Sequence, residues 1–221
     1  MRPFDVILFD WDGTLQDSTA TIAACIQAAC VAVGEPEPAL ETAKHVIGLG
    51  LQDALMICAP QCPASKYPDL ARAYRHNYLQ QDAHLQFFEG ALELLTHLKA
   101  QGYLLTVATG KNRAGLDRVL ASTGIGHFFA TTRTADETES KPSPRMVLDT
   151  LAQLNIPAHR ALVVGDTTHD VQMANNACVQ AVALTQGAHD AAKLASAQPT
   201  VILERIAQLQ TWLDGLGART A

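Results

Sequence analysis

A chain of 221 residues is long enough for one large domain, or for a core of ordinary size that carries a small insert. Hydrophobic residues make up 48% and charged residues 17%, a balance that excludes an intrinsically disordered chain. The formal net charge of -6 argues against a nucleic acid polymer as partner, so an anionic ligand needs a local positive site: a metal ion, a lysine or a helix N-terminus.

The sequence contains no signal for secretion or membrane insertion. Its first ten residues already reach an acidic cluster, and no apolar stretch is long enough to span a membrane. The five cysteines are an odd number and include no Cys-x-x-Cys pair, which is typical of a reduced protein with buried thiols. We therefore expect a cytoplasmic protein with no membrane partner, either a monomer or a homodimer.

The first predicted element is a strand over residues 5–9, a short apolar run typical of a strand covered on both faces. Asp10-Trp11-Asp12-Gly13-Thr14 follows it directly. Asp17-Ser18 then offers an N-cap for an alanine-rich helix over residues 19–33. From residue 35 to about 88 the pattern stays helical, interrupted by prolines and glycines, and we expect no strand there.

After Glu89-Gly90 strands and helices alternate, which predicts a parallel sheet with crossover helices. The fold class is therefore α/β, with a Rossmann-like parallel sheet core that has helices on both faces. We expect this core at residues 1–15 and 89–221, with an inserted all-helical cap at 16–88. The predicted core elements are helices over 91–101, 112–123, 144–154, 170–176 and 203–213, and strands over 103–108, 128–131, 161–164 and 179–184.

Polar side chains gather where the predicted strands end. Asp10 and Asp12 follow the first strand, Thr109 follows the second, and Asp166 and Asp170 follow the fourth. In an open parallel sheet these ends line the ligand crevice. Carboxylates crowded there repel one another unless some are protonated or a hard cation binds them. Oxygen ligands with little sulfur or imidazole nearby favour Mg²⁺.

Other residues at the same edge fit phosphate chemistry. Thr109 carries a hydroxyl, and Gly110 has an unobstructed backbone N–H at the approach to a helix N-terminus, where anions bind. Lys141, held by the stiff Lys-Pro step, can neutralise an anionic oxygen. Gly13 lets the backbone turn tightly under a bound phosphate.

Four segments resemble the four motifs of the haloacid dehalogenase superfamily, in the family's order and on the expected strand ends. They are Asp10-Trp11-Asp12-Gly13-Thr14-Leu15, Thr109-Gly110, Lys141-Pro142 and Gly165-Asp166-Thr167-Thr168-His169-Asp170. The insertion resembles the family's small helical cap. Within the family, the sequence most resembles the phosphoglycolate phosphatase-like members. The resemblance implies a magnesium-dependent phosphatase that acts on a small phosphorylated metabolite.

The resemblance also implies a role for each aspartate. Asp10 attacks phosphorus and forms an aspartyl-phosphate, which water then hydrolyses. Asp12 gives a proton to the leaving oxygen and later takes one from the water. The carboxylates of Asp10 and Asp166 hold magnesium together with the backbone carbonyl of Asp12, and Asp170 ligates it directly or through water.

Phosphate binding and substrate selection are assigned in the same way. Thr109 and Lys141 hold the phosphoryl oxygens and offset their charge, beside Gly13 and Gly110. The apolar cap loop Val46-Ile47-Gly48-Leu49-Gly50-Leu51 closes over the leaving group. Phosphoglycolate is the default substrate by resemblance, with a nucleotide, a sugar phosphate or pyrophosphate as alternatives.

Other activities of the superfamily fit less well. Dehalogenase relatives lack a proton donor such as Asp12, and sugar phosphomutases carry a catalytic histidine where Ile22 stands. Phosphonate hydrolases need a lysine just after the cap glycine, where this chain has Leu49-Gly50-Leu51. A non-catalytic binding module with an inactive site is disfavoured, because every expected catalytic side chain is present. His169 is expected to be a solvated loop histidine.

Overall fold

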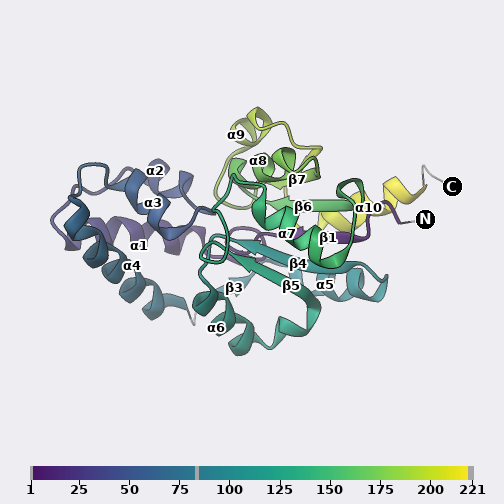
Figure 1. Cartoon of the computed structure of the whole chain (residues 1–221), viewed down its shortest axis with the longest axis horizontal. Helices are drawn as coiled ribbons and strands as arrows, with labels where there is room; N and C mark the ends of the chain where they lie inside the picture. Colours follow the sequence, from purple (N-terminus) through teal and green to yellow (C-terminus); the bar gives the residue numbers. More distant parts are fainter. Residues whose placement is uncertain (1, 83–84, 219–221) are drawn as a thin grey trace.

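The computed structural model describes residues 2–82 and 85–218. A six-stranded parallel sheet in the order β5-β4-β1-β6-β7-β8 forms its centre (Figure 1). The strands are β1 (Val6–Phe9), β4 (Leu104–Thr109), β5 (Phe129–Thr134), β6 (Ala161–Gly165), β7 (Gln180–Leu184) and β8 (Val201–Leu203). The helices of this part are α5 (Ala91–Ala100), α6 (Arg113–Thr123), α7 (Arg145–Leu154), α8 (Thr168–Asn176), α9 (Ala191–Ser196) and α10 (Gln208–Ala218), with short 3₁₀ turns η3 (Ile125–Phe128) and η4 (Ala158–Arg160).

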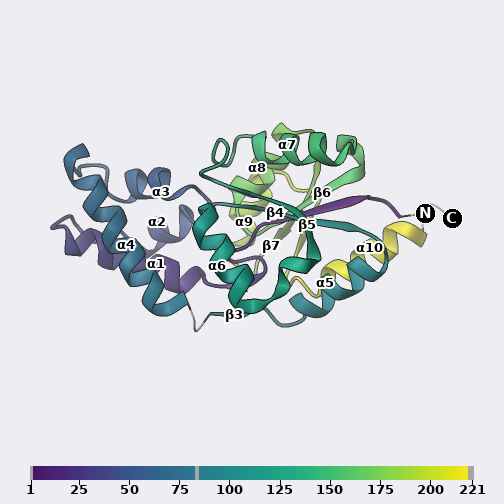
Figure 2. The ribbon, with the colours of Figure 1, turned by 60° about the horizontal axis from the view of Figure 1, so that its bottom comes forward.

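Side chains of β1 alternate between the two faces of the sheet, as the period of a strand requires. Ile7 and Phe9 pack in one hydrophobic cluster with residues of α5, α6 and α10. Val6 and Leu8 pack in a second cluster with residues of α7, α8 and α9. Figure 2 shows α7 and α8 on one side of the sheet and α5 and α10 on the other. The predicted α/β class, with helices on both faces, is confirmed.

A separate group of helices lies beside the sheet, at the left of Figure 1. These helices enclose a third hydrophobic cluster that includes Ile26, Leu55 and Leu70. The proposed limits of this cap, residues 16–88, stay a prediction. In the described part of the chain, no helix has both the length and the apolar character needed to cross a membrane. The elements are α1 (Thr19–Ala32), α2 (Leu40–His45), α3 (Leu51–Cys58), η1 (Ala64–Lys66) and α4 (Tyr67–Gln81).

Two short strands connect the cap helices to the core. β2 (Gln16–Asp17) and β3 (Gln86–Phe87) pair antiparallel, with Gln16 opposite Phe87 and Asp17 opposite Gln86. The expectation of no strand between residues 35 and 88 was therefore wrong. A strand of two residues is too short to show a period of two, and its partner lies at the far end of the insertion.

The C-terminal part also differs from the prediction. Residues 201–203 form β8, which pairs with β7, and α10 begins only at Gln208 rather than at residue 203. A three-residue apolar run fits a strand and a helix equally well, so its conformation is determined by its pairing with β7. Helix α9 was not predicted; its N-cap Asp190 accepts a hydrogen bond from the Lys193 N–H at 2.8 Å.

Candidate active site

Three of the four predicted carboxylates meet at one edge of the sheet. Asp10 follows β1 and Asp166 follows β6, and these two strands pair side by side. Oxygens of Asp10, Asp166 and Asp170 lie within 4.8 Å of one another. Their exposed fractions are only 2%, 0% and 1%, so the negative charges are concentrated where water cannot screen them.

Asp166 is held by the loops around it. The Thr14 hydroxyl donates to its Oδ1 at 2.7 Å, and the Ala188 N–H donates to its Oδ2 at 2.8 Å. Gly13 has a φ of 82°, and a Cβ there would overlap the Asp166 carboxylate. Gly187 approaches the same carboxylate equally closely. Gly13 was predicted from its place in the first motif, whereas Gly187 was not, because the folded loop is what brings Gly187 to Asp166.

Asp170 has protein donors at both of its oxygens. It closes a capping box at the start of α8, where the Thr167 N–H and hydroxyl donate to Oδ2 at 3.1 and 2.6 Å. Lys141 Nζ donates to Oδ1 at 2.7 Å and lies 2.7 Å from Oδ1 of Asp10. The Lys141 side chain is buried, so this one amine offsets the charge of two carboxylates.

The balance of burial and charge differs among the three aspartates. Burial raises the pKa of Asp10 to about 7, against the opposing charge of Lys141. Burial, together with Asp10 and Asp170, also raises the pKa of Asp166. Burial also acts to raise the pKa of Asp170. The charge of Lys141 and the hydrogen bonds from Lys141 and Thr167 outweigh it and hold this pKa below the ordinary value.

This donor set fits a hard divalent cation. Three carboxylates face a single amine, and Oδ2 of Asp10 has no hydrogen-bond partner among the described residues. All the donors are oxygens, which Mg²⁺ prefers. Asp10, Asp166 and Asp170 are the residues that could hold such an ion. Both oxygens of Asp166 and of Asp170 already accept hydrogen bonds from the protein, so Oδ2 of Asp10 is the most available of these oxygens.

Asp12 stands apart from this group and faces the cap. Its Oδ1 accepts a hydrogen bond from the Ser18 hydroxyl at 2.7 Å and lies 3.1 Å from Lys111 Nζ. Lys111 in turn donates to the Tyr78 hydroxyl of α4 at 2.7 Å. Lys111 has no role predicted from the sequence, because its contacts with the cap depend on how the cap packs on the core.

The cap loop at residues 46–51 reaches the aspartates through its glycines. Gly48 has a φ of 92°, and a Cβ there would lie 3.3 Å from the Thr167 hydroxyl and 4.0 Å from Oδ2 of Asp10. The Gly50 N–H donates to the Ser140 hydroxyl at 2.8 Å. Val46 and Ile47, with 1% and 2% of their surface exposed, are also part of the hydrophobic cluster of the cap.

The two residues after β4 lie beneath this loop. Thr109 is fully buried, and its hydroxyl accepts a hydrogen bond from the Lys111 N–H at 3.2 Å. A Cβ at Gly110 would overlap the carbonyl oxygens of Gly48 and Leu49. Gly110 therefore lets the cap loop pack directly on the core, in addition to its predicted place at the phosphate site.

A cavity of about 630 Å³ lies between cap and core. Its wall is largely apolar, and Asp12 and Lys111 contribute charge on the core side. Tyr74 and Tyr78 of α4 and the loop that includes Leu49 line it from the cap. Among the aspartates at this edge of the sheet, Asp12 lines the cavity and Asp10 does not.

His169 lies in the fourth motif but is not solvated. Only 8% of its surface is exposed, and its Nε2 lies 2.7 Å from the His45 carbonyl oxygen of the cap. The expectation of a solvated loop histidine was therefore wrong. The reason is tertiary: α2 of the cap ends directly over α8, and its last carbonyl needs a donor.

A parallel sheet whose strand ends converge on buried aspartates beneath a helical cap defines a class of α/β hydrolases. Residues 7–184 match the family model described as haloacid dehalogenase-like hydrolase. The chain therefore belongs to this family, and the resemblance inferred from the four motifs is confirmed.

Individual relatives cover almost the whole chain. It is 32% identical to "Probable phosphatase IndB" of Dickeya dadantii, across 95% of this chain and 92% of that protein. It is 29% identical to a phosphoglycolate phosphatase of Vibrio cholerae, across 95% and 96%. The crystal structure of a predicted phosphoglycolate phosphatase from Haemophilus somnus superimposes with a TM-score of 0.84 at 26% identity, covering 96% of this chain and 98% of the other.

Proposed function

We propose that this protein is a magnesium-dependent phosphatase that hydrolyses a small phosphomonoester through an aspartyl-phosphate on Asp10. The observation that carries the proposal is the environment of Asp10. One carboxylate oxygen is paired with Lys141, and the other has no hydrogen-bond partner among the described residues and faces the cap loop at Gly48. A nucleophile needs this combination of fixed orientation and an available lone pair.

The surrounding residues support each step of the proposed reaction. Asp10 attacks phosphorus, while Lys141 and the Thr109 hydroxyl offset the charge of the phosphoryl oxygens. Asp12 protonates the leaving oxygen from the cavity side and later activates the hydrolytic water. Bound magnesium would be held by Asp10, Asp166 and the Asp12 carbonyl, and would add positive charge at the transferred group.

Gly13 and Gly110 complete the proposed phosphate site. Gly13 allows the turn that carries Asp12 to pass close to Asp166, and Gly110 presents its backbone beneath the cap loop. The cap loop at residues 46–51 would then close the site above the phosphate. Closure that excludes bulk water strengthens every charge interaction beneath it, while a single water is still needed for the second step.

We further propose that the leaving group carries a second anionic group, as phosphoglycolate does. The supporting feature is Lys111, whose side chain is only 10% exposed and whose amine lies between Asp12 and Tyr78 at the wall of the cavity. A carboxylate or second phosphate that enters this cavity meets Lys111 next to the proton donor. The V. cholerae relative, named for phosphoglycolate, is consistent with this substrate class.

The nucleophile is tested with Asp10→Asn, which keeps the shape of the side chain but removes its charge. Turnover of phosphoglycolate and p-nitrophenyl phosphate with Mg²⁺ should fall to background, while Asp69→Asn, an exposed position on α4, retains full activity. Wild-type protein mixed with radiolabelled substrate and quenched in acid should carry the label on Asp10. Activity in a folded Asp10→Asn protein, or a label on another residue, would refute the mechanism.

A further inference from the structure

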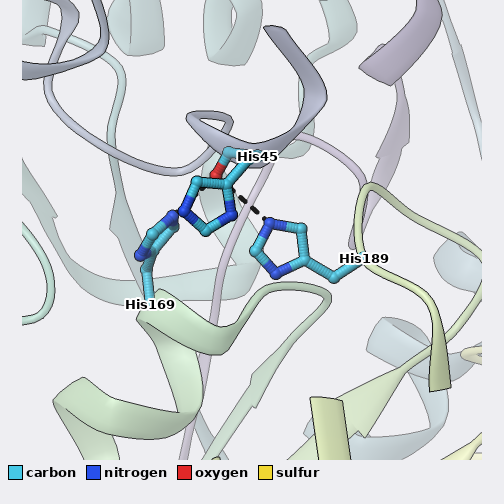
Figure 3. A group of neighbouring side chains, drawn as sticks. All are labelled: His45, His169 and His189. Carbon is cyan, nitrogen blue, oxygen red and sulfur yellow. Dashed lines mark hydrogen bonds between the residues drawn. The ribbon is translucent and has the colours of Figure 1, made fainter. Parts of the chain in front are cut away.

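A cluster of three histidines lies at the junction of cap and core, outside the aspartate cluster. His45 is the last residue of α2, His169 is in the first turn of α8, and His189 lies in the loop between β7 and α9. Ligand nitrogens of the three rings lie within 4.8 Å of one another. Figure 3 shows the three side chains arriving from three separate elements and facing one another around the His45 backbone.

The rings are held in this arrangement by hydrogen bonds. Nε2 of His169 and Nε2 of His189 lie 2.7 and 3.1 Å from the His45 carbonyl oxygen. The Thr168 N–H donates to Nδ1 of His189 at 3.0 Å, so the proton of the neutral His189 ring is on Nε2. The carbonyl of His45 thus accepts two hydrogen bonds and draws the two core imidazoles together beneath the cap.

The three rings also contact one another, one pair stacked and the other two pairs tilted or edge-to-face. The centroids of His45 and His189 are 5.1 Å apart with ring planes 9° from parallel, and the centroid of His169 lies 5.2 Å from that of His45. His169 and His189 are 8% and 1% exposed, whereas the His45 side chain is exposed. A solute therefore reaches the cluster from the side of His45 and finds two buried rings behind it.

We propose that His45, His169 and His189 form a second metal site, which binds a borderline divalent ion such as Zn²⁺ and bridges the cap to the core. Three imidazole ligands with an open fourth position for water suit Zn²⁺, whose bonds to histidine nitrogen are about 2.0–2.1 Å. Imidazole donors also bind Cu²⁺ and Ni²⁺ but do not suit Mg²⁺, which prefers oxygen. The two sites therefore select different ions.

Binding exchanges two hydrogen bonds for metal–nitrogen bonds. Nε2 of His169 and Nε2 of His189 both face the His45 carbonyl oxygen, so coordination through these nitrogens requires side-chain rotations that break the two hydrogen bonds. The ligand nitrogens already lie within 4.8 Å of one another, so binding requires a further approach of the three rings to metal–nitrogen distances of about 2.0–2.1 Å. An ion held this way fixes α2 of the cap against α8 and the loop after β7.

The site is tested by titrating Zn²⁺ into the full-length protein in saturating Mg²⁺, which keeps the aspartate cluster occupied. Isothermal titration calorimetry should show one Zn²⁺ per chain, and His45→Gln should weaken binding by at least tenfold, since loss of even an outer-shell partner of a metal costs about 10–100-fold. His45 is exposed, so this variant does not endanger the core. His97→Gln, an exposed position on α5, should bind Zn²⁺ like wild type.

A spectroscopic measurement identifies the ligands independently of affinity. Co²⁺ added in the same buffer should give the visible absorption of a four-coordinate nitrogen-rich site, and this absorption should disappear in His45→Gln, His169→Gln and His189→Gln. Equal loss in the cap variant and both core variants shows that the ion bridges the two parts. Unchanged Zn²⁺ affinity in His45→Gln, or absence of Zn²⁺ binding to wild type in Mg²⁺, would overturn the proposal.

Discussion

Lys111 connects the proposed proton donor to the cap. Its amine lies 3.1 Å from Asp12, donates to Tyr78 at 2.7 Å and lies 4.7 Å from the centre of the Tyr78 ring. The second oxygen of Asp12, Oδ2, accepts no hydrogen bond from the described residues, so it is available to the leaving group. One lysine can thus orient the proton donor and attract an anionic substrate.

Lys111→Met keeps most of the side-chain stem and removes the charge. We expect kcat/KM for phosphoglycolate to fall by about 10–100-fold, the value of one hydrogen bond to a charged group. Ethyl phosphate, an alkyl ester without the carboxylate, should lose much less. Lys66→Met, on the cap away from the cavity, serves as the control. If both esters lose activity by the same factor, Lys111 acts only through Asp12 and does not select the substrate.

At the level of single residues, the sequence was most informative where a strand sets the position. Asp10 and Asp166 come together because their strands are neighbours in the sheet. Gly187, Lys111 and the buried state of His169 were missed, because each depends on loops or on the cap folding against the core. Local patterns contain no information about such long-range contacts.

The loop between α2 and α3 brings the cap backbone close to Asp10, the proposed nucleophile. A Cβ at Gly48 would lie 4.0 Å from Oδ2 of Asp10, and the φ of 92° at Gly48 disfavours any other residue. We expect Gly48→Ala to lower kcat for every substrate by about tenfold or more, because the added carbon displaces the loop or Thr167, and small displacements at a reacting centre are costly. Steady-state kinetics with phosphoglycolate and p-nitrophenyl phosphate measures this effect.

Gly34 offers a matched control for the backbone strain at Gly48. It also has a positive φ, 78°, but a Cβ there would meet nothing within 4 Å. Gly34→Ala should therefore lower the melting temperature about as much as Gly48→Ala while leaving kcat unchanged. A comparable loss of kcat in both variants would mean that cap stability, and not contact at Gly48, controls turnover.

Secondary elements were predicted well where the pattern is long and poorly where pairing alone defines the element. The β1, β4 and β6 strands are apolar runs under helices, which a sequence pattern reveals. β3 and β8 have two and three residues and exist through their partners β2 and β7. α9 has six residues, too few for a helical period to be visible.

The whole molecule should respond to pH through its buried aspartates. A carboxyl whose pKa rises on folding stabilises the folded state while it is protonated, and this contribution is lost as pH rises through the folded pKa. For Asp10 that pKa is about 7, against an ordinary value of 3.8. Without Mg²⁺, the protein should therefore lose stability as the pH rises through this range.

Mg²⁺ should offset that loss, because in the proposed site it would bind the ionised aspartates. We expect the Mg²⁺-induced rise in melting temperature to be larger above pH 7 than below it, with each kcal/mol of stabilisation worth about 2–4 °C for a chain of this size. Differential scanning calorimetry is performed with and without Mg²⁺ at each pH. The difference between the two melting temperatures removes the contribution of groups that titrate in both conditions. Asp166→Asn should reduce the Mg²⁺-induced rise; an equal rise at all pH values would contradict the prediction.

The paired strands β2 and β3 have a consequence for how the fold tolerates changes in length. The chain leaves the core at Asp17 and returns at Gln86, directly opposite in the antiparallel ladder. Neighbouring strands lie about 4.7–4.9 Å apart, so the two ends of the inserted segment are adjacent whatever lies between them. Helices can thus be added, removed or exchanged in this segment without altering the order of the six parallel strands. Such an insertion point lets new specificities evolve by replacement of one module, while the residues that handle phosphate remain on an unchanged scaffold.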